Sequence, residues 1–95
     1  MKVAWSAKSL RSFKRIVRKN PQLRLLIEDK LRQLAEDPFH PSLRTNKLKG
    51  DLADSWSCSL DYDYRIIFEF VRVTEEEEEE EAILLLNIGN HDEVY

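Results

Sequence analysis

The sequence predicts a single α+β domain spanning residues 1–95, in which an N-terminal strand and a helical hairpin precede antiparallel strands, in the order β-α-α-β-β-β. The first observation is a change of hydrophobic period: apolar residues recur every three or four positions before Pro38 and alternate in stretches beyond Pro41. The second is composition, because only two Gly and three Pro occur and no linker divides the chain. The third is a length that leaves room for one core.

Two amphipathic helices with almost no linker form the first half of the chain. Lys2–Trp5 is partly β-favouring and predicts a short initial strand. After Ser6, apolar residues line one side of a predicted helix that ends at Asn20-Pro21, and basic residues cover its other sides. The same pair is expected to begin the second helix, with Asn20 as N-cap and Pro21 at the first helical position, and this helix runs to Asp37-Pro38.

Strand patterns fill the second half. Residues 43–48 and 56–61 show the two-residue alternation of strands, and Lys49-Gly50-Asp51 predicts a turn between them. Residues 65–73 are rich in β-branched and aromatic side chains on both faces, which is typical of a central strand. Residues 82–88 predict the next strand.

Two segments are expected to lie outside the regular elements. Glu75–Glu81 is an uninterrupted glutamate run, whose mutual repulsion and lack of apolar groups predict a mobile hairpin loop. We expect this loop to project away from the active face. Gly89-Asn90 predicts a turn that leads into an exposed tail, residues 91–95.

One face of the sheet is expected to bury the helical hairpin, which leaves the opposite, concave face open to a ligand. Trp5 is expected beneath the helices, and Trp56 and Cys58 are interpreted as core residues. His40, between two prolines, is interpreted as a loop residue without a role.

The charge distribution predicts an anionic partner. Residues 1–49 carry thirteen Lys or Arg against four Asp or Glu, and without the glutamate run the net charge changes from −3 to +4. This excess favours a polyanion or an acidic protein as partner, although a solvated helical surface would show the same composition.

Composition also excludes several classes. The longest apolar run, Ala82–Leu86, is far shorter than the ~18 residues that cross a bilayer, and no secretory signal follows the basic N-terminus, so a cytoplasmic protein is expected. Cys58 is the only cysteine, which excludes an intramolecular disulfide and a thiolate zinc site. The sequence has no phosphate-cradling glycine loop and no metal-ligand spacing, so we expect neither a cofactor nor a metal.

The remaining polar side chains of the strand half suit metal-free cleavage of RNA. A 2′-hydroxyl attacks its own adjacent phosphate when a base withdraws its proton, a cation stabilises the phosphorane and an acid protonates the leaving 5′-oxygen. Tyrosines on the same surface could stack on unpaired bases. The candidates are Lys47, Lys49, Asp63, Tyr64, Arg65, His91 and Tyr95.

Over nearly its whole length, including the helical hairpin and the strand order, the chain resembles RelE/ParE-superfamily toxins of type II toxin–antitoxin systems, and it is most similar to the RelE/YafQ branch. The resemblance rests on Lys47-Leu-Lys-Gly-Asp-Leu, Trp56, Asp63-Tyr64-Arg65 and above all the ending Gly-Asn-His91-Asp-Glu-Val-Tyr95. It implies the RelE/ParE-like fold and a metal-independent endoribonuclease (an mRNA interferase) that cuts mRNA in the ribosomal A site. It also implies a cognate antitoxin as partner.

The resemblance implies roles for individual residues. His91 matches the terminal catalytic histidine and is expected as general acid, while Asp63 or a lysine assists the base step. Arg65 is expected on the phosphate. Tyr64 and Tyr95 are expected to position the nucleotide, and Lys47 and Lys49 resemble RNA-binding lysines. Ser59 stands where YafQ-like toxins carry a further histidine, so the acid–base assignment is not copied whole.

The same residues also allow structural interpretations without a role in catalysis. Arg65 could pair with Glu69 or Asp63, the two lysines could be a charged hairpin rim, and His91 could be solvated. Two other functions compete with RNA cleavage: ParE-like inhibition of DNA gyrase, and an inactive chain that only binds its antitoxin. The codon preference and the antitoxin's identity do not follow from the sequence.

Overall fold

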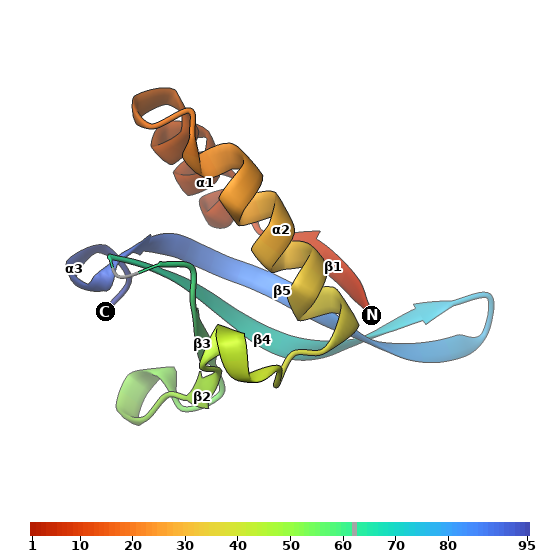
Figure 1. The fold of residues 1–95 in the computed structure, drawn as a ribbon. Coiled ribbons are helices and arrows are strands. Elements are labelled where there is room, and N and C mark those ends of the chain that lie inside the picture. The colour runs from red at the N-terminus through yellow and green to blue at the C-terminus, as the bar shows by residue number, and fades with distance from the viewer. Residues whose placement is uncertain (62) are drawn as a thin grey trace.

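A five-stranded mixed sheet organises the computed structural model, which describes residues 1–61 and 63–95 (Figure 1). The strand order is β1-β5-β4-β3-β2. β1 pairs with β5 in parallel, and every other neighbouring pair is antiparallel. The predicted α+β class, with one strand and two helices before the main strands, is confirmed. The strands are β1 (Lys2–Trp5), β2 (Asn46–Lys47), β3 (Trp56–Ser59), β4 (Tyr64–Glu75) and β5 (Glu78–Asn90).

Both long helices lie over one face of the sheet, α1 (Ala7–Lys19) beside α2 (Leu23–Glu36) (Figure 1). Ser6 begins α1, because its hydroxyl accepts a hydrogen bond from the backbone N–H of Ser9 at 3.0 Å. None of the helices in the described part of the chain is long and apolar enough to cross a membrane.

The predicted start of the second helix is wrong by two residues. Asn20 is not its N-cap: the backbone N–H of Asn20 bonds to the carbonyl of Ile16 and so ends α1. The carbonyl of Asn20 accepts from Leu23 N in a turn, and α2 begins only there. Pro21 and Gln22 form this turn and precede α2.

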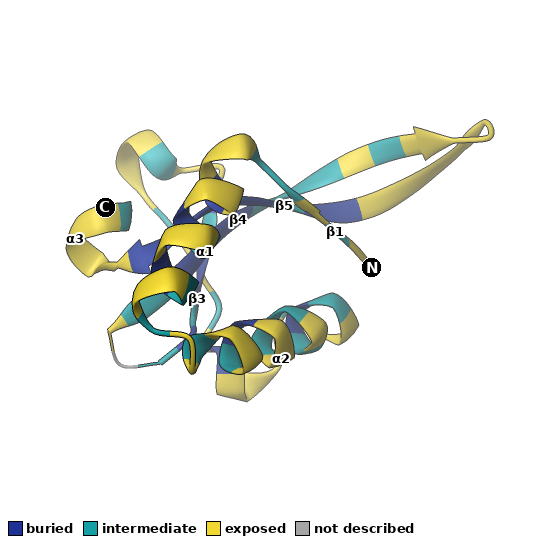
Figure 2. Cartoon of the chain, turned by 90° about the horizontal axis from the view of Figure 1, so that it is seen from above, coloured by how far each residue is buried: buried dark blue, intermediate teal, exposed yellow. Residues whose placement is uncertain are grey.

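The core lies between the helices and the sheet, where dark residues line the inner sides of both layers (Figure 2). Cys58 is fully buried, Trp56 packs against the core, and the ring centroid of Trp5 lies 5.0 Å from that of Phe13 on α1. These three placements confirm the sequence interpretation. The buried cluster comprises Ile16, Ile27, Leu34, Leu43, Cys58, Leu60, Ile66, Phe68, Ile83, Leu85 and Ile88.

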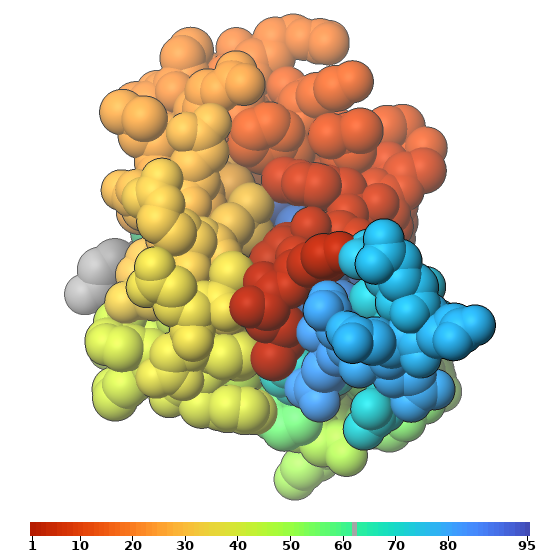
Figure 3. Space-filling view, turned by 90° about the vertical axis from the view of Figure 1, so that its right-hand side faces the viewer, coloured from red at the N-terminus to blue at the C-terminus, as the bar shows by residue number. Residues whose placement is uncertain are grey.

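The first strand lies between α2 and the hairpin of β4 and β5, as the space-filling view from the hairpin end shows (Figure 3). The N-terminal ammonium group donates a hydrogen bond to the carbonyl of Ala35 on α2 at 3.1 Å. Lys2 forms an ion pair with Glu75 of β4. The start of the chain is thus held by both layers.

The strand predicted over residues 43–48 is largely absent. Pro41–Leu43 forms a 3₁₀ turn, η1, and Arg44 then takes a left-handed backbone conformation with φ 49°, which no strand accommodates. Only Asn46–Lys47 pairs as β2. The predicted turn at Lys49-Gly50-Asp51 is confirmed: Gly50 has φ 71° and opens a second 3₁₀ turn, η2 (Gly50–Leu52).

The glutamate run does not form the predicted loop. β4 continues to Glu75, β5 starts at Glu78, and Glu76-Glu77 alone forms the turn, both with positive φ. Main-chain pairing propagates outward from the buried part of the two strands, and cross-strand cations offset part of the repulsion, as Arg72 does with Glu79 at 3.8 Å. The hairpin tip and the C-terminus lie at opposite ends of this ribbon, so the run projects away from the C-terminal residues (Figure 1).

Candidate functional site

The sheet face away from α1 and α2 carries the predicted arginine. Ser59 on β3 lies opposite Arg65 on β4, and Arg65 lies opposite Gly89 on β5. Directly paired residues project to the same face, and the neighbouring row, Cys58, Ile66 and Ile88, belongs to the core. The alternation therefore places Arg65 on the face opposite the core.

The C-terminal residues form a short helix over this face. α3 (His91–Val94) starts at Asn90, whose side chain accepts from Glu93 N at 2.9 Å while the Glu93 carboxylate accepts from Asn90 N at 3.1 Å. A Cβ added to Gly89 would lie 2.9 Å from Glu93 Cβ, so glycine permits this close approach. The predicted turn at Gly89-Asn90 is therefore wrong, because both residues belong to β5, whereas the residues predicted as an exposed tail are mostly exposed but form a helical turn.

The face beneath α3 is consequently not open, which corrects the expectation of an uncovered concave surface. Ser57 is 1% exposed and Ile67 3% exposed. The hydroxyl of Tyr95 donates a hydrogen bond to Ser57 Oγ at 2.7 Å, which closes the last turn against β3. The part of the face directly beneath α3 is therefore closed to a ligand.

His91 and Tyr95 form one exposed pair. Their ring centroids lie 4.6 Å apart with an interplanar angle of 54°. A residue and the one four positions later face each other on a helix, so the single turn of α3 produces this contact directly. Because the Tyr95 hydroxyl is bonded to Ser57, the phenol ring is held in place, and it packs against one side of the exposed His91 imidazole.

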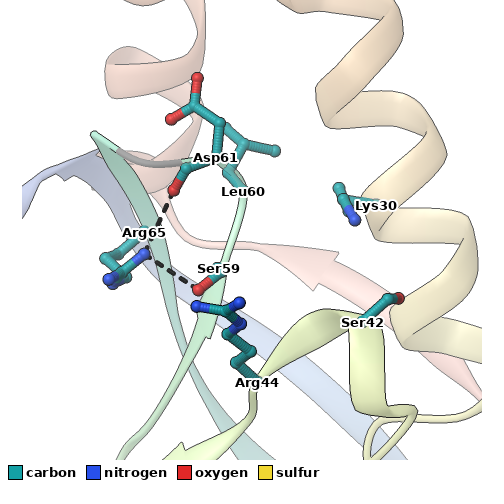
Figure 4. Close-up of a pocket in the computed structure, with 7 residues that line it drawn as sticks. All are labelled: Lys30, Ser42, Arg44, Ser59, Leu60, Asp61 and Arg65. Atoms are coloured by element: carbon teal, nitrogen blue, oxygen red, sulfur yellow. Dashed lines mark hydrogen bonds between the residues drawn. The ribbon is translucent and has the colours of Figure 1, made fainter.

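Arg65 is held by neutral acceptors. Its guanidinium donates to Ser59 Oγ at 2.9 Å and to the backbone carbonyl of Asp61 at 3.2 Å (Figure 4). Within residues 1–61 and 63–95 it forms no ion pair with Glu69 or Asp63, the two partners that the sequence suggested. The guanidinium therefore keeps its positive charge while its orientation is fixed.

Two hollows flank the segment that carries Arg65. The first, of about 380 Å³, contains Arg65, and the second, of about 400 Å³, brings Asp63, Tyr64 and His91 together. Between them, the Asp61 carboxylate accepts hydrogen bonds from the backbone N–H groups of Asp63 and Tyr64, each at 2.8 Å. Neighbouring residues of one turn thus line both hollows.

The two predicted lysines lie elsewhere. Lys47 pairs with Trp56, so it lies on the core-side face, with its ammonium 5.9 Å from the indole centroid. Lys49 is the exposed residue before η2. Among the described residues, neither lysine lines the hollow of Arg65 or that of His91.

Sequence reasoning missed a polar network that anchors α3 to α1. Ser12 donates to Asn87 Oδ1 at 2.8 Å, and the Asn87 amide donates to the Glu93 carbonyl at 3.4 Å. Arg15 forms an ion pair with Glu93 at 3.1 Å. The spacing Asn90-x-x-Glu93 is a capping-box signature that could have indicated α3, whereas nothing in the sequence marks Asn87 as its support.

Cys58 is a buried ionisable group beneath this edge of the sheet. Burial raises the pKa of the Cys58 thiol to about 12, against the opposing charges of Lys30 and Arg65. Such a thiol is neither a nucleophile nor a metal ligand at neutral pH. In the described part of the chain, no three His, Cys, Asp or Glu side chains are grouped to hold a metal ion.

Several solved structures share this fold. A YoeB/ParE toxin from Agrobacterium tumefaciens is 22% identical with a TM-score of 0.77, covering 96% of this chain and 99% of that one. YafQ from Escherichia coli BL21(DE3) is 10% identical with a TM-score of 0.75, covering 99% and 97%. A chain of a YoeB–YefM complex from Staphylococcus aureus is 14% identical with a TM-score of 0.70, covering 96% and 97%. None of the curated proteins matches the sequence.

One family model matches almost the whole chain. It describes the ParE toxin of the type II toxin–antitoxin system parDE, and it matches residues 3–95, which include α1, α2, α3 and every strand except the first residue of β1. The match extends from the first strand to the C-terminal residues that fold over the sheet. The chain therefore belongs to the ParE toxin family, within the RelE/ParE superfamily of type II toxins.

Proposed function

We propose that this toxin is a metal-independent endoribonuclease that cuts mRNA in the ribosomal A site. The observation that carries the proposal is the state of Arg65, a fixed guanidinium bonded only to neutral oxygens, on the sheet face over which α3 presents His91. A preorganised cation that is not neutralised by a carboxylate suits an anion on which charge develops during reaction. A scissile phosphate is such an anion.

In the proposed reaction, the ribose 2′-hydroxyl attacks the adjacent phosphorus and the bond to the 5′-oxygen breaks. Arg65 stabilises the phosphorane, and His91, exposed at the start of α3, gives a proton to the leaving 5′-oxygen. Asp63, in the same hollow as His91, assists removal of the 2′-hydroxyl proton. Tyr64 and Tyr95 position the nucleotide through their rings.

The charge of α1 supports a ribosomal target. The helix carries six basic residues and no acidic one, and within the described residues its only ion pair is that of Arg15 with Glu93. Such a surface attracts the phosphates of ribosomal RNA. The basic residues are Lys8, Arg11, Lys14, Arg15, Arg18 and Lys19.

We further propose a cognate antitoxin as protein partner. The YoeB–YefM structure from Staphylococcus aureus is a complex of a toxin with its antitoxin. The basic helix α1 of this chain would complement an acidic amphipathic segment of such a partner.

Mapping of RNA ends in expressing cells tests the nuclease function. Wild-type protein is expected to arrest translation and to create new mRNA ends within codons, and His91→Ala and Arg65→Ala are expected to abolish both effects. Arg72→Ala, a charge loss on the same strand near the hairpin, and His40→Ala are the matched controls and should remain toxic. Full toxicity of both site variants would refute the proposal.

A second candidate function is binding of DNA gyrase, which the ParE description of the matching family model favours. It predicts DNA damage with intact messages in expressing cells. The same two site variants then remain toxic, because neither residue would take part in cleavage.

A further inference from the structure

The hollow that contains Arg65 gathers two further cations from separate parts of the chain. Lys30 comes from α2 and Arg44 from the residue that follows η1, and the close-up shows both around the same space as Arg65 (Figure 4). The hydroxyls of Ser42 and Ser59 add neutral polar groups to the lining. Three positive charges thus share one concave surface of about 380 Å³.

None of these three cations, Lys30, Arg44 and Arg65, is paired with an acidic side chain in the part of the chain that the structure describes. The one carboxylate in the lining, that of Asp61, accepts hydrogen bonds from two backbone N–H groups of its own turn. Like charges brought together without a counter-ion repel one another, so this arrangement favours an external anion.

The local backbone places Arg44 at the same edge of the sheet as Arg65. Leu43 is fully buried, and Arg44 follows it with φ 49°, a conformation that turns the chain sharply beside the core. β2 pairs only with Trp56 and Ser57, so the strand edge at Ser59 is left uncovered next to Arg65. The hollow therefore opens directly beside the guanidinium that we assign to the scissile phosphate.

We propose that Lys30 and Arg44 form a second phosphate subsite, which holds the RNA backbone phosphate next to the one at Arg65. The subsite rests on the proposed nuclease function for the identity of its ligand. It extends the substrate contact from one phosphate to two, and it orients the strand across the edge of β3 toward His91.

Binding of a short uncleavable oligonucleotide tests the subsite. A 2′-deoxy trinucleotide lacks the attacking hydroxyl, so its affinity for the purified toxin can be measured by NMR titration without turnover. Lys30→Gln and Arg44→Gln are each expected to weaken binding about fivefold. Each is also expected to reduce the slope of log affinity against log salt by about 0.7.

Arg32→Gln is the matched control, because Arg32 is an exposed cation on the same helix and pairs with Asp29 outside the hollow. It should bind like the wild type, and Lys30→Arg, which keeps the charge, should also retain binding. Equal losses in the Lys30, Arg44 and Arg32 variants would show diffuse attraction and overturn the subsite. Unchanged oligonucleotide binding with weakened antitoxin binding would assign the hollow to a protein partner and also overturn it.

The two proposals fail separately. Cleavage of mRNA on translating ribosomes reports the nuclease function, whereas the trinucleotide titration reports the subsite. If the wild type leaves messages intact while Lys30→Gln and Arg44→Gln still weaken oligonucleotide binding, the nuclease function is refuted and the phosphate subsite stands.

Discussion

Tyr95, the last residue of the chain, is bonded to Ser57 on β3: its hydroxyl donates a 2.7 Å hydrogen bond to the buried serine oxygen. This contact spans 38 residues of sequence and fastens α3 to β3. It also fixes the tyrosine ring that lies against His91. The position of His91, the proposed general acid, therefore depends on the hydrogen bond between Tyr95 and Ser57.

Tyr95→Phe should loosen α3 without unfolding the domain. The substitution removes one hydrogen bond and leaves the Ser57 hydroxyl buried without its partner, so the free energy of unfolding should fall by about 1 kcal/mol. Urea denaturation measures this loss, and amide exchange in His91–Val94 should accelerate. Ser57→Ala provides the second arm of a double-mutant cycle. Additive effects of the two substitutions would show that the bond contributes nothing.

Gly89→Ala should displace α3 by steric contact. The new methyl group would lie 2.9 Å from Glu93 Cβ and 3.2 Å from Val94 Cγ1, so the helix must move away from the sheet. A misplacement of about 1 Å can lower a catalytic rate by about a hundredfold, and cleavage of mRNA should fall on that scale.

Gly50→Ala is the control for this substitution. Its methyl group meets nothing within 4 Å, but φ 71° makes the backbone strained, so stability should fall by about 1 kcal/mol with cleavage retained. A Gly89→Ala protein with wild-type cleavage would show that the position of α3 is unimportant for the reaction.

Asn87→Ala should uncouple α3 from α1. Asn87 is 8% exposed and connects the Ser12 hydroxyl to the Glu93 carbonyl, so its loss leaves a buried hydroxyl without an acceptor. We expect a loss of about 1–3 kcal/mol in the free energy of unfolding, measured by urea denaturation. Ser12→Ala in the same background should then cost little more, because its bonding partner is already gone. A full additional loss would contradict the network.

The stability of the protein should fall as pH rises above about 9. The Cys58 thiol has an ordinary pKa of 9.0, and burial raises its pKa to about 12 in the folded chain. Between these values the unfolded chain loses a proton that the folded chain keeps, so alkaline pH favours unfolding. The pKa of Lys2, raised mainly by its hydrogen bond to Glu75, adds a loss of the same sign only above 10.5.

Urea denaturation between pH 8.5 and 10 therefore measures the contribution of the Cys58 thiol to the pH dependence of stability. Cys58→Ala should be less stable throughout, because it leaves a cavity, but its stability should vary less across this range. An identical pH dependence in the wild type and the variant would exclude Cys58 as the cause.

Local pattern was sufficient for the helices and the central strands, because their apolar periods coincide with the faces that they bury. It failed at the glutamate run, where Glu75 and Glu78 pair because the register of the buried part of β4 and β5 continues outward. The composition of the run carries no information about this pairing between strands. It failed at residues 43–48 as well, where the left-handed Arg44 interrupts the alternation.

The placement of the candidate residues was only partly predictable. Asp63, Tyr64 and His91 line one hollow and Tyr95 lies against His91, yet nothing in the sequence pairs Arg65 with Ser59 rather than with a carboxylate. The face of a residue depends on strand register, which a short strand specifies weakly. The two predicted lysines therefore lie away from the site, and Lys30 and Arg44 beside Arg65 were missed.

The chemical nature of the RNA ends tests the central claim most directly. Purified toxin would be added to ribosomes stalled on a defined message, and the downstream fragment would be labelled with and without prior phosphatase treatment. Attack by the 2′-hydroxyl predicts a downstream fragment with a 5′-hydroxyl, formed by the wild type and by Arg72→Ala but not by His91→Ala or Arg65→Ala. An uncut message, or a downstream fragment that carries a 5′-phosphate, would contradict the account.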